Sequence, residues 1–137
     1  MALVARQGSQ APGFAKGATF EKFDAIALPD KGGVIVLATV NPDSAAGVTA
    51  ANNQGIWVGA TAADLQLIIR TGDQYAGKTI GSISFLPTLQ YVNGQSRSFA
   101  QSTGDFVFLV EFTNKNFGIF EVCLLYTSFP RFRFLCP

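Results

Sequence analysis

The sequence predicts an all-β fold made of tandem four-stranded antiparallel units that are arranged like the blades of a β-propeller. Hydrophobic residues make up 48% of the 137 residues and charged residues only 14%, and 14 glycines favour a packed chain with many tight turns. Residues 67–77 repeat the pattern of residues 3–13 at an offset of 64 positions. A repeat of this kind is typical of one supersecondary unit that is used several times.

The first unit extends to about residue 73 and begins with a short strand expected at residues 3–7. A loop rich in Gly, Pro and Ala follows at residues 8–17. Residues 19–28 have an ambiguous period, because the apolar positions 20, 23 and 26 have helical spacing whereas 26 and 28 have strand spacing. After a turn at Pro29–Gly33, the remaining strands of the unit are expected at Val34–Val40, Gly55–Gly59 and Leu65–Arg70. The first of these three is continuous and β-branched, which predicts burial on both faces.

The second unit covers about residues 74–122 and repeats the strands with loops of different length. Gly104–Phe112 matches Gly32–Val40 at an offset of 72, and Gly118–Phe120 matches Gly55–Trp57 at an offset of 63. The β-repeat region is therefore residues 3–122. Two blades alone would leave apolar faces and open strand edges, so we expect the chain to be a fragment of a longer protein. The alternative is a small β-sandwich that closes on itself.

Composition and charge make several classes of function unfavourable. The net charge of +1 comes without a basic stripe, which argues against a nucleic-acid partner. No apolar run is long enough to span a membrane, and the N-terminus lacks the pattern of a signal peptide. The absence of histidine removes Ser-His-Asp, Cys-His and His-metal sites, and Cys123 and Cys136 lack the spacing of metal ligands. We expect no enzymatic activity, no cofactor and no metal.

A few acidic residues remain as weak candidates for chemistry. Asp73 and Asp105 each follow a glycine at a turn and could form a carboxylate pair of the glycosidase kind. The favoured interpretation is that each accepts backbone hydrogen bonds in a tight turn. The oxygens of Asn41-Pro42-Asp43 could bind calcium, although no Asp-x-Asp-x-Asp-Gly series is present.

Two pairs of residues recur at matching positions of the units. Arg6 and Arg70 could bind a ligand, but recurrence favours a structural use, either at the edge of the next unit or paired with an acid. Trp57, with Phe120 at the equivalent position, is the candidate for stacking on a sugar ring. Its favoured role is in the hydrophobic core.

The ordered motifs resemble a bacterial family, the choice-of-anchor tandem repeat proteins named for an NxxGxxxF motif. Residues that carry the resemblance are Phe20, Phe23, Gly32, Gly55-Ile56-Trp57, Arg70-Thr71-Gly72-Asp73, Gly104 and Phe108. The Asn of the motif is replaced by Pro29 in the first copy and by Gln101 in the second, and the first closing turn has Ser9 instead of Asp. The resemblance implies an extracellular or cell-surface protein, often with a PEP-CTERM-type anchor, and it supplies no catalytic residues.

Residues 123–137 are predicted to be a non-native tail. Cys123–Ser128 is the translation of TGT CTC TTA TAC ACA TCT, a string within the mosaic end of a transposase-based sequencing adapter. We expect the native sequence to end near Cys123.

Together these observations predict a non-enzymatic structural or interaction repeat module of an exported or cell-surface bacterial protein. Its expected partners are further repeats of the same polypeptide, with a surface glycan or protein as a further candidate. The alternatives are a carbohydrate-binding module that uses Trp57 and a fragment of a glycoside-active enzyme that uses turn carboxylates.

Overall fold

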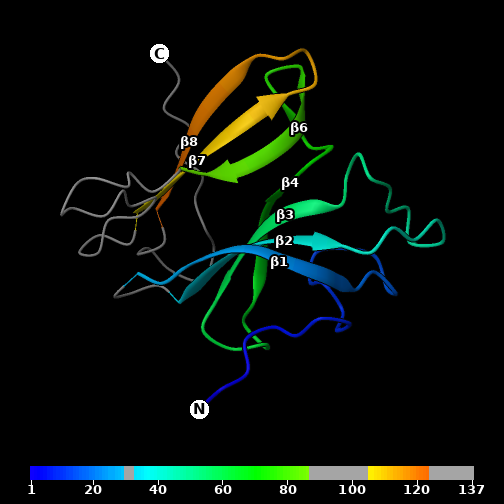
Figure 1. Ribbon diagram of the computed structural model, residues 1–137, viewed down its shortest axis with the longest axis vertical. Coiled ribbons are helices and arrows are strands. Elements are labelled where there is room, and N and C mark those ends of the chain that lie inside the picture. Colours follow the sequence, from blue (N-terminus) through cyan, green and yellow to red (C-terminus); the bar gives the residue numbers. More distant parts are fainter. Residues whose placement is uncertain (30–32, 87–104, 124–137) are drawn as a thin grey trace.

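The computed structural model describes residues 1–29, 33–86 and 105–123, and within them the chain is all-β, with two four-stranded antiparallel sheets and no helix (Figure 1). This confirms the predicted all-β fold with four-stranded units. The first sheet has the order β1 (Phe20–Ala27), β2 (Val34–Val40), β3 (Gln54–Gly59) and β4 (Gln66–Arg70). The second has the order β5 (Gln74–Tyr75), β6 (Lys78–Phe85), β7 (Asp105–Phe112) and β8 (Phe117–Cys123).

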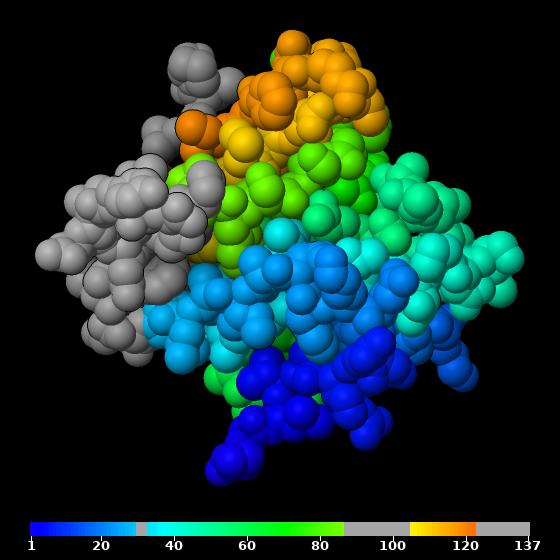
Figure 2. Space-filling view, viewed as in Figure 1, coloured from blue at the N-terminus to red at the C-terminus, as the bar shows by residue number. Residues whose placement is uncertain are grey.

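The chain is layered, with the N-terminal segment (residues 1–19) on one side of the first sheet and the second sheet on the other (Figures 1 and 2). One hydrophobic core lies between the two sheets, where Ile35, Leu37 and Ile56 meet Phe106, Phe108 and Phe112. A second core lies between the first sheet and the N-terminal segment. The first sheet is therefore covered on both faces.

Strand β2 shows why a continuous apolar run is needed at this place. Successive side chains of a strand point to opposite faces. Ile35 and Leu37 belong to the core between the sheets, whereas Val36 and Ala38 belong to the core under the N-terminal segment. The predicted burial of this strand on both faces is confirmed.

Strand β1 resolves the ambiguous period of residues 19–28. Its pairing with β2 has register shifts between Phe20 and Lys22 and between Phe23 and Ala25. Each bulge adds one residue to the strand, so the side chains that face the same way are three residues apart instead of two. Phe20, Phe23 and Ile26 therefore share a face at helical spacing within a strand.

The strand expected at residues 3–7 is absent, and that prediction is wrong. The matching residues 67–71 fall largely in β4, whose backbone is paired with β3. Residues 3–7 have no neighbouring strand in the described part of the chain; one loop hydrogen bond holds Leu3, whose carbonyl accepts from the Ala62 N–H at 3.2 Å. A strand sequence without a partner strand does not form a strand.

The repeated turn nevertheless has the same hydrogen bonds in both copies. Gly8 N–H donates to the Phe20 carbonyl and Phe20 N–H donates to the Ser9 carbonyl, at 2.8 and 3.0 Å. In the second copy, Gly72 N–H donates to the Ile80 carbonyl and Ile80 N–H donates to the Asp73 carbonyl, at 2.8 and 2.9 Å. Each turn thus joins its unit's first long strand in the same way.

Some sequence predictions fall on residues outside the described ranges. These are the middle of the turn at residues 30–32, the motif positions Gln101 and Gly104, and the tail at 124–137. The resemblance to propeller blades stays a prediction. Face-to-face stacking of two sheets is compatible with blades and with the alternative sandwich.

One polar side chain connects the two sheets across their core. Gln54, at the start of β3, accepts a hydrogen bond from the Ile83 N–H of β6 at 2.9 Å through its Oε1. The backbone of Gln54 is held in turn by Thr71, which is buried: Thr71 N–H donates to the Gln54 carbonyl at 2.8 Å, and Gln54 N–H donates to the Thr71 Oγ1 at 3.1 Å. Gln54 therefore links the start of β3 in the first sheet directly to β6 in the second.

We expect Gln54→Ala to lower the free energy of unfolding by about 1–3 kcal/mol, because it leaves the buried Ile83 N–H without its acceptor. Gln66→Ala is the matched control, since Gln66 is exposed on β4, and its cost should stay within about 0.5 kcal/mol. Urea unfolding followed by Trp57 fluorescence measures both. Equal losses in the two variants would contradict a structural role for the Gln54 bond.

Candidate functional site

Trp57 is the predicted stacking residue, and it lies at the centre of the core under the N-terminal segment. Its side chain is 0% exposed, and its indole N–H donates to the Pro12 carbonyl at 2.9 Å. The Phe14 ring stacks on it at 5.8 Å between centroids, and the Phe20 ring meets it edge-on at 4.9 Å. Both the ring and its polar atom are occupied by the protein itself. A sugar could stack on Trp57 only if the N-terminal segment moved away, so the burial favours the core role.

The glycine of Gly-Ile-Trp makes room for this indole. Residues two apart in a strand share a face, so Gly55 lies beside Trp57. A Cβ on Gly55 would come within 3.0 Å of the Trp57 ring and of the Ile69 carbonyl oxygen. The second copy has the same arrangement, because a Cβ on Gly118 would lie 2.9 Å from the Phe120 ring. The motif is therefore a packing device in which a ring lies over a glycine of its own strand.

Phe120 is buried among aromatic rings in the core between the sheets. Tyr75 meets it edge-on at 4.9 Å, and Phe108 stacks on it at 5.8 Å. Tyr75 comes from the short strand β5 that precedes β6, just as Phe14 comes from the loop that precedes β1. In each unit, the aromatic residue of the Gly-Ile-aromatic strand thus packs against a ring from the segment that precedes the first long strand.

Arg70 and Asp73 form a self-contained turn. Arg70 N–H donates to the Asp73 carboxylate at 3.0 Å, and the Arg70 Nε lies 3.4 Å from the same carboxylate. Gly72 has a φ of 86°, in the left-handed region that favours glycine. The Arg70 guanidinium also lies over the Phe14 ring, 4.9 Å from its centroid. Asp73 therefore accepts a backbone hydrogen bond in a turn, and Arg70 is paired with an acid, as the sequence favoured. Arg6, the equivalent of Arg70 in the first copy, is exposed.

The remaining acidic candidates lie in ordinary loop and strand positions. Asp105 is the first residue of β7, and Asp43 accepts the N–H groups of Ala45 and Ala46 at 2.9 and 3.4 Å. The Asn41 amide donates to Thr19 and not toward Asp43. Across the described ranges, no three His, Cys, Asp or Glu side chains are grouped as metal ligands.

Among the residues that the structure describes, Lys22 and Asp64 have shifted pKa values, and both shifts are away from neutral pH. The hydrogen bond from Lys22 to Asp24, at 2.7 Å, raises the pKa of Lys22 above its usual value. Hydrogen bonds from the backbone and hydroxyl of Thr61 lower the pKa of Asp64. Both groups therefore remain ionised at pH 7, and neither is suited to proton transfer there.

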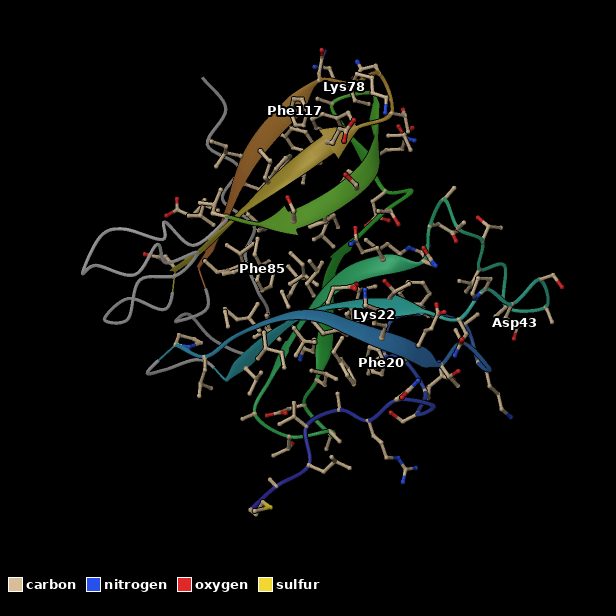
Figure 3. All side chains as sticks on the ribbon, viewed as in Figure 1. Phe20, Lys22, Asp43, Lys78, Phe85 and Phe117 are labelled. Carbon is tan, nitrogen blue, oxygen red and sulfur yellow. The ribbon has the colours of Figure 1, made fainter. Side chains whose placement is uncertain are left out.

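Exposed apolar side chains gather on the outer side of the second sheet. Phe117 and Ile119 of β8 are 63% and 68% exposed, and they lie on one face because they are two residues apart. Figure 3 shows Phe117 on the outer sheet, whereas Phe85 lies between the two sheets. Val107 and Leu109 of β7 alternate with the core residues of that strand and are half-buried on the same outer side. We call these four residues the outer face.

Sequence reasoning missed Phe14, Gln54 and this outer face. Phe14 and Gln54 stand in stretches that read as loop, and their contacts are with residues far away in the chain. The outer face was missed because β7 matches β2 in sequence, and only the structure shows that β7 alternates in burial whereas most of β2 is buried.

Comparison with known proteins gives one family. A sequence model of the family of unknown function DUF7453 matches residues 1–125. Searches of curated proteins and of solved structures gave no match. In the part of the chain that is described, no helix is long and apolar enough to cross a membrane.

Trp57 is the only tryptophan, so its fluorescence reports directly on this cluster. We expect iodide to quench it weakly in the native protein. Phe14→Ala should increase quenching and cost about 3 kcal/mol of stability, because it opens the cover and leaves a cavity. Phe117→Ala, on an exposed ring, is the control and should change neither. Native quenching as strong as in urea would show that Trp57 is accessible.

The two motif glycines differ in what surrounds them. Gly118→Ala should cost about 1–3 kcal/mol, because the added Cβ meets the rings of Phe120 and Phe112. Phe120→Leu should reduce that cost in a double-mutant cycle. Gly55→Ala should be rescued less by Trp57→Leu, since the Ile69 carbonyl also blocks the site. Additive costs at Gly118 would contradict the ring-over-glycine explanation.

Proposed function

The chain belongs to the DUF7453 family, and we propose that it is a non-enzymatic structural or interaction module whose sheets stack face to face. One observation carries the proposal: the motifs that recur between the units are used for turns and packing. The Arg-x-Gly-Asp segment closes a turn on itself, and the Gly-Ile-aromatic strands seat buried rings. Residues kept for catalysis would instead be expected to point their reactive atoms into a cleft.

The stacking of the sheets supports the interaction part of the proposal. In repeat proteins each unit contacts its neighbours, and the stability of the array comes largely from these interfaces. Here the first sheet has a hydrophobic core on each side, while the second presents exposed apolar residues on its outer side. A sheet that is used in this way serves as a layer in an assembly.

We also propose that the module acts outside the cell or at its surface. The support is the resemblance of its ordered motifs to exported bacterial repeat proteins. Brief protease treatment of intact cells that produce the protein should then degrade it while a cytoplasmic marker survives. Protection of the protein until the cells are lysed would count against this location.

Absence of catalysis can be tested directly. Purified protein incubated with a panel of soluble polysaccharides should release no reducing ends above the level of a heat-denatured sample. Asp73→Asn and Asp105→Asn are the matched variants, since both acids were candidates for glycoside chemistry. Activity that either substitution abolishes while circular dichroism is unchanged would overturn the non-enzymatic function.

A further inference from the structure

The two sheets use corresponding positions in different ways. Positions in β2 and β7 correspond at an offset of 72, and positions in β3 and β8 at an offset of 63. In the first sheet, three apolar residues face the second sheet and are buried in the core between them: Ile35, Leu37 and Ile56. Their counterparts in the second sheet are Val107, Leu109 and Ile119. None of these counterparts is fully buried.

The contrast is sharpest between Ile56 and Ile119. They are the same residue at the same place in the Gly-Ile-aromatic motif. Ile56 is 0% exposed because the second sheet covers it, whereas Ile119 is 68% exposed. Phe117, two residues before Ile119, adds an exposed ring to the same face.

The opposite faces follow a matching rule. In the first sheet, Val36, Ala38 and Trp57 face the N-terminal segment. Their counterparts Phe108, Val110 and Phe120 face the first sheet. In both sheets, the face that carries the aromatic residue of the Gly-Ile-aromatic motif packs against the preceding layer of the chain. In the first sheet, the face that carries the isoleucine of this motif packs against the following layer.

We propose that the outer face of the second sheet, formed by Val107, Leu109, Phe117 and Ile119, docks a further four-stranded unit of this same kind. The partner is a sheet that presents an aromatic face like that of Phe106, Phe108 and Phe112, and it stacks as the second sheet stacks on the first. The interface already present between the sheets covers the equivalent residues, and the new interface continues it. The inference rests on the proposed function as a stacking module.

Position 117 makes this docking more apolar than the existing interface. Phe117 corresponds to Gln54 at the offset of 63. Gln54 supplies the hydrogen bond between the sheets to Ile83, and Phe117 supplies a ring instead. Contact with the next sheet at this place therefore rests on packing, and the missing acceptor can be restored by Phe117→Gln.

The test extends the chain by one unit. Residues 60 and 123 correspond at the offset of 63, so a copy of residues 61–123 is joined directly after residue 123. We expect the extended chain to unfold in one transition at a higher urea midpoint than the parent, because a new interface is added. Ile119→Glu in the first copy should lower the midpoint of the extended chain strongly and that of the parent only slightly. Ile56→Glu is the control and should lower both.

A second extended chain carries Phe117→Gln, so that the hydrogen bond between sheets is available if packing alone does not hold the added unit. Separate unfolding of the added unit in both extended chains, or failure of both to fold, would overturn the proposal. So would an Ile119→Glu effect that is equally small in parent and extended chain. A parent that sediments as a dimer broken by Ile119→Glu would assign the face to a second copy instead. The polysaccharide assay is read on the parent alone, so failure of docking and failure of the proposed function remain distinguishable.

Discussion

The first sheet must satisfy two hydrophobic cores at once, and this constraint determines most of the structure. Successive side chains of a strand point to opposite faces, so β2 can contribute to both cores only if its consecutive residues are apolar. Ile35 and Leu37 pack toward the second sheet and Val36 and Ala38 toward the N-terminal segment. The first sheet covers the inner side of the second, and within the described residues β7 alternates in burial accordingly.

The repeated motifs allow the tight turns and the close ring packing that this layered arrangement requires. A sheet between two layers needs tight turns at its ends and rings that fit close to the backbone. Gly72 supplies the left-handed conformation of the turn, and Asp73 accepts the N–H of Arg70 there. Gly55 leaves space for the Trp57 ring. Recurrence of these residues follows from geometry that both units share, which is why it does not by itself indicate an active site.

Much of this fold could be predicted from the sequence, and the failures have physical causes. Strands β2, β3 and β4 were expected within one residue of their bounds, because their apolar runs and flanking turns are local signals. The period of β1 was ambiguous because two bulges shift its register. Residues 3–7 repeat a strand sequence but have no strand to pair with among the described residues. The covering role of Phe14 and the bond of Gln54 depend on distant partners, which no local pattern reveals.

The two ends of the stack differ, and the difference gives the stack a direction. At the N-terminal end of the stack, residues 11–18 form a longer loop than their counterparts 75–78, and this loop brings Phe14 over Trp57. On the outer side, Ile119 remains exposed. The faces that meet are of different kinds, so stacking of further units in this way would be head-to-tail. The proposed further unit would therefore stack on the outer face of the second sheet in the same orientation in which the second sheet stacks on the first.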